Sequence, residues 1–141
     1  MKIPQISVFL ENKAGRLAHI TRVLRDARVN ILALSLADTS DFGILRLIVD
    51  NIEAAKEALA AESIVSMVND VTAVEVDNRP GGLAAILDAL EGCGVNVEYM
   101  YAFAEHRAQK AALIFRFDHP EAAIERLEKM GVNVMSGGEI L

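Results

Sequence analysis

Two polar, glycine-bearing stretches are the strongest candidates for chemistry in this sequence, because one pattern occurs in both. They are residues 11–17 (ENKAGRL) and residues 77–83 (DNRPGGL), and each residue of the second follows its counterpart by 66 positions. Each stretch comes after an alternating apolar run and before a helical pattern, which predicts a strand that ends in a short loop and opens into a helix. The first N–H groups of a helix point outwards at the positive end of its dipole, so such a loop is suited to a carboxylate or another anion.

The elements that must position these loops repeat in the same order. In the first half, the apolar spacing predicts a strand over 5–10, a helix from the loop to about 27–28, strands over 31–37 and 43–49, a helix over 51–61 and a strand over 63–68. In the second half, it predicts a strand over 72–77, a helix over 81–90, strands over 97–103 and 110–117, a helix that starts at 118–121 and ends at Gly131, and a strand over 132–135. Each half is therefore β-α-β-β-α-β, the ferredoxin-like arrangement of the α+β class, with an antiparallel sheet and helices on one face. We expect two domains, 1–70 and 71–141, and we expect modules this small to pack on one another and on a second chain.

Composition and charge exclude several classes of protein. The chain has 141 residues, of which 52% are hydrophobic, a net charge of −6 and one cysteine, Cys93. The acidic balance argues against nucleic acid, whose binding depends on clustered lysine and arginine. One cysteine and three scattered histidines offer no disulfide and no metal-ligand spacing, so we expect no metal and no other cofactor. The sequence has neither a signal peptide nor an apolar run of membrane length, so we expect a cytoplasmic protein that binds no membrane.

Identity between the two halves is concentrated around the loops. Residues 11–31 match residues 77–97 at eight of twenty-one positions. Five of the eight are apolar residues, whose identity a shared fold explains. The other three, Asn12, Gly15 and Asn30, are not explained in this way. Each unit has Asn-x-x-Gly-x-Leu between its first strand and first helix, and Val-Asn-Ile or Val-Asn-Val where its second strand begins. By these motifs the chain resembles the ACT domains over essentially its whole length, and it is most similar to the small stand-alone tandem-ACT proteins.

The resemblance implies a regulatory protein rather than an enzyme. Family members bind a small ligand, often an amino acid, at the loop after the first strand, commonly at an interface between two ACT units. Carried over by position, the ligand-binding candidates of the first unit are Asn12, Ala14, Gly15, Arg16, Leu17, Asn30 and Ile31. Those of the second unit are Asn78, Pro80, Gly81, Gly82, Leu83, Asn96 and Val97. We expect no catalytic residue, an amino acid as ligand, and a homodimer or higher homo-oligomer. Because Gly82 stands where the first unit has Arg16, the two sites should not be equivalent.

Each candidate also has a purely structural interpretation. The loop asparagines could cap or turn the backbone, and the loop glycines could serve only a turn that needs positive φ. Asn30 and Asn96 fit a corner between a helix and a strand. Two other functions stay open at this point. One is an enzyme of acylphosphatase type, in which Arg16 and Asn30 would hold an anion. The other is a structural dimerisation module, which no small molecule would stabilise.

Overall fold

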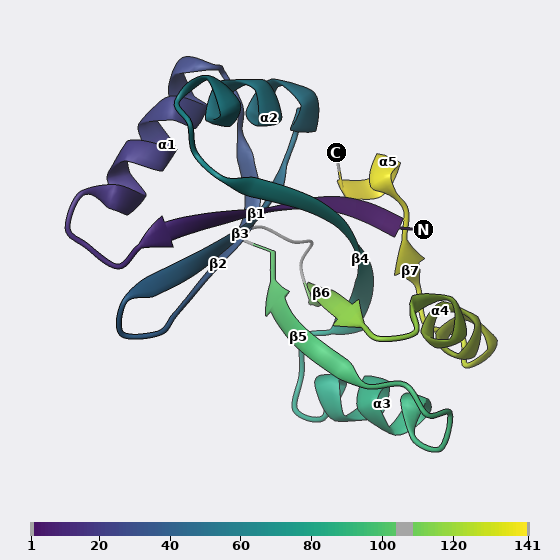
Figure 1. Cartoon of the computed structure of the whole chain (residues 1–141). Coiled ribbons are helices and arrows are strands. Elements are labelled where there is room, and N and C mark those ends of the chain that lie inside the picture. The colour runs from purple at the N-terminus through teal and green to yellow at the C-terminus, as the bar shows by residue number, and fades with distance from the viewer. Residues whose placement is uncertain (1, 104–108, 141) are drawn as a thin grey trace. The chain divides into compact units, whose positions relative to one another are not determined.

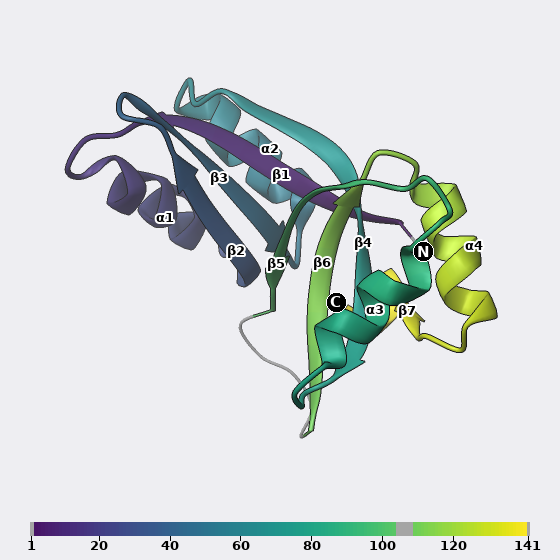
Figure 2. The same cartoon turned by 90° about the horizontal axis from the view of Figure 1, so that it is seen from below.

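The computed structural model describes residues 2–103 and 109–140 of the chain. Within this range the protein forms two compact units. The N-terminal unit is Pro4–Asn69, and the C-terminal unit contains residues 70–140 together with residues 2 and 3. Figures 1 and 2 show that each unit has its own helices.

The N-terminal unit has the expected β-α-β-β-α-β order. Its elements are β1 (Lys2–Glu11), α1 (Arg16–Asp26), β2 (Ile31–Asp38), β3 (Phe42–Val49), α2 (Ile52–Ala61) and the first residues of β4 (Ser66–Asp77). Strand β3 lies between β1 and β2 and is antiparallel to both, while β1 lies between β3 and β4. Both helices cover one face of these strands, as Figure 2 shows. This order places the loop after β1 at the same end of the sheet as the β2–β3 hairpin.

The C-terminal unit repeats this order. After the rest of β4 come α3 (Gly82–Leu90), β5 (Val97–Ala102), β6 (Lys110–Phe117), α4 (Pro120–Lys129), β7 (Val134–Met135) and a short helix, α5 (Gly137–Ile140). Strand β6 is antiparallel to both β4 and β5, and β7 pairs with the other edge of β4. The ferredoxin-like α+β fold expected from the sequence is therefore confirmed in both units.

Each unit has a separate apolar core between its helices and its strands. In the N-terminal unit, the helical spacing buries Ile20 and Leu24 of α1 and Leu59 of α2 against β1 and β3. Asn51 supports this packing, because its side chain accepts the Ala54 N–H at 3.1 Å and so caps the start of α2.

The C-terminal core is built in the same way. Ile86 and Leu90 of α3 and Leu127 of α4 are buried against the strands. In β6 the rings of Phe115 and Phe117 stack, with their centroids 5.1 Å apart and an interplanar angle of 6°. Cys93, which follows the end of α3, packs against this core as a partly buried residue.

One expectation about the strands was wrong. Strands expected separately over 63–68 and 72–77 are a single strand, β4, and the expected domain boundary falls inside it. The polar pair Asn69 and Asp70 looks like a break in the sequence. The chain stays extended there because the Asn69 side chain accepts a hydrogen bond from the Gln5 amide at 3.1 Å, so the polar group is satisfied without a turn.

Smaller differences lie at the ends of elements. Asp118 stands just before Pro120 and Glu121, a pattern that predicts it as the cap of α4. It instead accepts the Asn96 N–H at 2.8 Å, and His119 occupies the N-cap position without a side-chain hydrogen bond. The helical spacing of Leu17, Ile20 and Leu24 predicts one buried face for α1, but Leu17 is 37% exposed. Helix α5 was not expected, since two consecutive glycines begin it and glycine is a poor helix former.

Candidate functional site: the two strand-to-helix loops

Both loops end in a glycine that opens the following helix. Gly15 has φ 87° at the N-cap of α1, and Gly81 has φ 86° at the N-cap of α3. Neither helix receives a side-chain hydrogen bond at its cap, in contrast to α2. The positive φ explains why glycine stands at both positions. The first N–H of each helix donates within its loop, from Arg16 to the Lys13 carbonyl at 3.3 Å and from Gly82 to the Arg79 carbonyl at 3.0 Å. The next N–H groups of each first turn receive no side-chain cap and are left to solvent or to a ligand.

Asn12 ties the first loop to the neighbouring hairpin. Its side-chain amide donates to the Asp38 carboxylate at 3.2 Å and lies 3.3 and 3.4 Å from the backbone carbonyls of Thr39 and Ser40. Its backbone N–H donates to the Asp41 carbonyl at 2.9 Å. The side chain of Asn12 therefore holds the β2–β3 hairpin beside the loop, a structural role that differs from the capping or turn-forming role considered from the sequence.

Glu11 is paired with the two cations of the first loop. The Lys13 Nζ lies 2.9 Å from one of its carboxylate oxygens, and the Arg16 guanidinium lies 3.7 Å from the other. The hydrogen bond from Lys13, with a smaller contribution from Arg16, lowers the pKa of the Glu11 carboxyl below its ordinary value. Arg16 thus forms a surface ion pair within its own loop.

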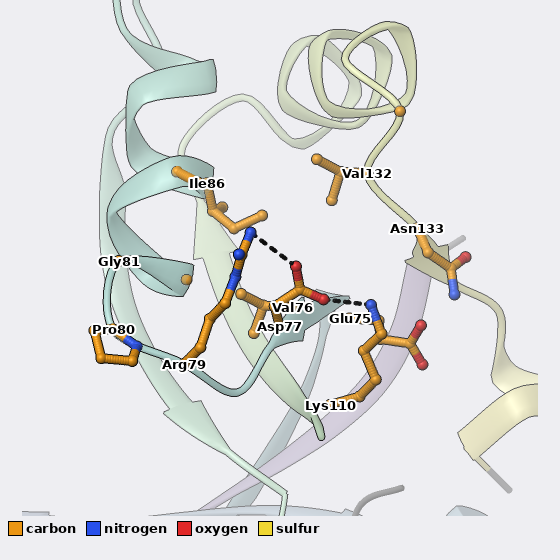
Figure 3. A pocket seen from close by; sticks show the side chains of 13 residues that line it. Glu75, Val76, Asp77, Arg79, Pro80, Gly81, Ile86, Lys110, Val132 and Asn133 are labelled. Carbon is orange, nitrogen blue, oxygen red and sulfur yellow. Dashed lines mark hydrogen bonds and ion pairs between the residues drawn. The ribbon is translucent and has the colours of Figure 1, made fainter. Parts of the chain in front are cut away.

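Asp77 has the corresponding position at the second loop and a different set of partners. Lys110, from the start of β6, donates a hydrogen bond to its carboxylate, and the Arg79 guanidinium lies 3.3 Å away on the other oxygen. Figure 3 shows these two side chains approaching the Asp77 carboxylate from opposite sides. The hydrogen bond from Lys110 lowers the pKa of Asp77, and the same contact raises the pKa of Lys110.

The acid titration of Asp77 tests this pair. In carboxyl NMR spectra of the wild type, Asp77 should titrate below the ordinary range of aspartate, and Lys110→Met should raise its pKa. The lowered folded-state pKa means that the Asp77–Lys110 contact stabilises the protein above the unfolded-state pKa, and that this stabilisation is lost as the pH falls through the folded-state pKa. The pKa of Glu11 should not change in this variant. An unchanged pKa at Asp77 would show that Lys110 is not its partner in solution.

A cavity of about 280 Å³ lies beside the second loop. It is bounded by the end of β4, the first turns of α3, the start of β6 and the segment that leads into β7 (Figure 3). The charged and amide side chains that line it are Glu75, Asp77, Arg79, Lys110 and Asn133. Its size is just below the roughly 300–1,000 Å³ of pockets that hold drug-sized ligands, and so suits a smaller molecule.

Gly82 differs from Gly15 and Gly81 because close packing leaves no room for a side chain at its position. A Cβ at this position would lie 2.2 Å from the carbonyl oxygen of Asp77 and 3.1 Å from a methyl group of Val76. The second loop therefore closes tightly onto the end of β4. The first loop has Arg16 at this position and accommodates its side chain.

Asn30 and Asn96 lie at corners built in the same way. The Asn30 N–H donates to the Asp50 carboxylate at 2.9 Å, and the Asp50 N–H donates to the Asn30 carbonyl at 3.1 Å. Asn96 and Asp118 make the same two contacts, at 2.8 and 3.1 Å. Both corners precede an edge strand, at the opposite end of the sheet from the loops. Arg16 and Asn30 are therefore not brought together within the N-terminal unit, as an acylphosphatase-type centre would need.

The other candidates divide into two groups. Ile31 and Val97 pack as partly buried residues against the two cores. Leu17 and Leu83 are 37% and 39% exposed at matching positions beside the loops, although both are large and apolar. The remaining predicted residues, Ala14, Asn78 and Pro80, lie in the loops themselves, with the Asn78 N–H donating to the Gln109 carbonyl at 2.9 Å.

None of the five polar residues that line the cavity is among the predicted ligand-binding residues. Asp77 and Arg79 lie within the repeated loop stretch itself, whereas the other three lie outside it. Glu75, Lys110 and Asn133 come from strands and a strand entry far apart in the sequence, and only the pairing of β4 with β6 and the entry into β7 brings them together. Their only sequence signal is a polar residue at each of three positions where the first unit has an apolar one.

The fold and the two uncapped loops define a tandem pair of ferredoxin-like modules. The chain belongs to the ACT domain pair family, whose model matches residues 1–136. The resemblance seen in the sequence is thereby confirmed.

Solved structures show the same architecture. Protein BT0572 from Bacteroides thetaiotaomicron is 37% identical, with a TM-score of 0.93, over 99% of this chain and 96% of that one. The regulatory subunit of aspartate kinase from Thermus thermophilus, in a ligand-free form, is 17% identical with a TM-score of 0.66, over 89% of this chain and 91% of that one. At 17% identity the second likeness shows the fold alone. No curated protein matches the chain.

Residues 2–103 and 109–140 contain neither a helix of membrane-spanning character nor a cluster of metal-ligand side chains. Within these residues, no helix is long and apolar enough to cross a membrane. The same residues contain no group of three or more histidine, cysteine, aspartate or glutamate side chains placed to hold a metal ion.

Proposed function

We propose that this protein is a regulatory module that binds a free amino acid, or a closely related small molecule, at one or both of its strand-to-helix loops. The observation that carries the proposal is the shared opening of α1 and α3. In both, a left-handed glycine occupies the cap, no side chain caps the helix, and an exposed leucine follows two residues later. The uncapped N–H groups and the helix dipole favour a carboxylate.

The charge around the loops also fits a zwitterion. Each loop begins with a carboxylate, Glu11 or Asp77, beside which a ligand's ammonium group is favoured. Membership of the ACT domain pair family supports the same ligand class. The resemblance of the sequence to ACT domains implies that an amino acid binds at this loop. Binding regulates if one arrangement of the protein holds the ligand more tightly than another.

We also propose that a second copy of the chain completes the site. Strands β2 and β5 each pair with a single strand among the described residues, so each has an edge that can accept another strand. Antiparallel pairing of either edge with the same strand of a second copy would bring the corner at Asn30 or Asn96 of one copy to the loop end of the other. Leu34 and Leu36, about half exposed on β2, add apolar surface to such a contact.

A thermal-shift screen against the twenty amino acids at millimolar concentration tests the proposal. A ligand present at about 100 times its dissociation constant adds roughly 2.7 kcal/mol of stability, which raises the melting temperature by several degrees in a protein of this size. We expect one amino acid, or a few related ones, to produce such a shift. If none does, the structural dimerisation module becomes the better account of the protein.

Aspartate substitutions then locate the site. Gly15→Asp and Gly81→Asp each place a carboxylate where the ligand carboxylate is expected, and at least one of them should abolish the shift. Gly92→Asp is the matched control, because Gly92 also has positive φ, 82°, and open space around it, but lies at the far end of α3. Equal loss of the shift in all three variants would mean that the substitutions act through stability and not through binding.

A further inference from the structure

The two loops have different surroundings, and backbone hydrogen bonds show which residues correspond. In the N-terminal unit, the Phe9 N–H donates to the Val65 carbonyl at 3.1 Å. In the C-terminal unit, the Glu75 N–H donates to the Asn133 carbonyl at 3.0 Å. In each unit, the donor lies in the strand just before the loop. The acceptor lies just before the unit's last strand. Glu75 and Asn133 therefore occupy the positions of Phe9 and Val65.

Strand register identifies a third matched position. Glu11 pairs with Phe42 across β1 and β3, and Asp77 pairs with Lys110 across β4 and β6. Glu11 and Asp77 are the acidic residues that begin the two loops. Lys110 therefore stands where the N-terminal unit has Phe42.

All three matched positions are apolar around the first loop and polar around the second. Phe42 is 63% exposed and Val65 is 66% exposed, so these positions add apolar surface beside the first loop. The loop's own cations, Lys13 and Arg16, are both paired with Glu11. Apolar side chains such as those of Phe42 and Val65 cannot replace the water that an ammonium or a carboxylate group loses when it is bound. The second loop instead has a carboxylate, an ammonium and an amide at these positions, and they line the cavity of about 280 Å³.

The charges that line this cavity are balanced. Glu75 and Asp77 are anionic, and Arg79 and Lys110 are cationic. The Arg79 guanidinium has five N–H donors and uses only part of them on Asp77, so it has donors to offer a ligand carboxylate. Glu75 lies close enough to Lys110 to raise its pKa and is the carboxylate available to a ligand ammonium group. A neutral molecule that carries both groups close together matches this arrangement better than a simple anion or cation.

We infer that the protein has one ligand site per chain, the cavity of the C-terminal unit, and that this site takes a small molecule with a free ammonium and a free carboxylate group. Glu75 contacts the ammonium group, and Arg79 and Lys110 contact the carboxylate. The first loop keeps the same backbone but does not bind this ligand. The inference rests on the proposed function and adds which loop is used and which side chains recognise the ligand.

Calorimetric titration of the full chain tests the inference. The probes are the twenty amino acids and, for each one that binds, its N-acetyl and its amide derivatives. We expect about one molecule bound per chain, and no binding of either derivative. Loss of a hydrogen bond to a charged group corresponds to a roughly 10–100-fold weaker Kd, which is the change expected for Glu75→Gln and for Lys110→Gln. Phe42→Lys, the matched substitution at the first loop, should leave the Kd unchanged.

The outcomes separate this inference from the proposed function. Two molecules bound per chain would overturn the inference and leave the proposed function in place. The same conclusion would follow if Gly15→Asp abolished binding while Glu75→Gln and Lys110→Gln left the Kd unchanged. Retained binding of the N-acetyl or amide derivative would overturn the assignment of a zwitterion. If none of the twenty amino acids binds, the proposed function fails and the inference fails with it.

Discussion

Replacing Phe117 with alanine should lower the free energy of unfolding by about 3–5 kcal/mol. The side chain is 1% exposed and its ring stacks on Phe115 within the C-terminal core. The loss combines the transfer of a large apolar group with the cavity left among residues that can only partly relax. Chemical denaturation, followed by circular dichroism, measures the change.

Phe42→Ala is the matched control, since it removes the same side chain from a position that is mostly exposed. Its effect should stay within about 0.5 kcal/mol. Phe117→Leu keeps most of the apolar volume and should lose less stability than Phe117→Ala, which keeps the prediction testable if the alanine variant does not fold. Equal losses for Phe117→Ala and Phe42→Ala would contradict the core described for the C-terminal unit.

A single methyl group at Gly82 should cost about 1–3 kcal/mol of stability. The Cβ of Gly82→Ala would overlap the Asp77 carbonyl oxygen, and this oxygen belongs to backbone that cannot rotate away. The loop must therefore open, which should also weaken the contacts that Asp77 makes with Lys110 and Arg79. Chemical denaturation gives the free-energy change, and carboxyl NMR should show the pKa of Asp77 rising towards its ordinary value.

The corresponding position in the other unit supplies the control. Arg16 already has a side chain there, so Arg16→Ala should change stability by no more than about 0.5 kcal/mol. If Gly82→Ala is as harmless as Arg16→Ala, the second loop is not closed onto β4 in solution. In that case the cavity beside it would have a different shape from the one described.

The two loops share a backbone conformation but differ in the side chains that surround them. Both begin with an acidic residue and both open a helix at a left-handed glycine, so one backbone design serves twice. The side chains at the three compared positions are polar around the second loop, where they line a cavity, and apolar around the first. On the inference made above, the ligand binds at the second loop, and the first loop keeps the shared backbone without the polar cavity.

Much of the fold could be predicted from the sequence, because it depends on local patterns. Alternating apolar residues such as Leu45 and Leu47 indicate a strand, and Ile20 and Leu24 at helical spacing indicate a buried helix face. The repeated Asn-x-x-Gly-x-Leu motif predicted both loops, and their glycines have the positive φ that the motif suggested. These features need only a few consecutive residues, so one sequence is enough to reveal them.

The tertiary structure alone decided which residues meet. Lys110 lies 33 positions from Asp77, and the two become partners only because β4 pairs with β6 in one register. In the same way, a hydrogen bond from the Gln5 side chain of β1 satisfies Asn69 within a strand that its polar side chain seemed to end. The sequence by itself determined two ferredoxin-like units, each with a glycine-bearing loop between its first strand and its first helix, because periodicity and turn chemistry act locally. Strand register acts between distant segments, and it alone decided that the second loop is flanked by Glu75, Lys110 and Asn133 while the first is flanked by apolar side chains.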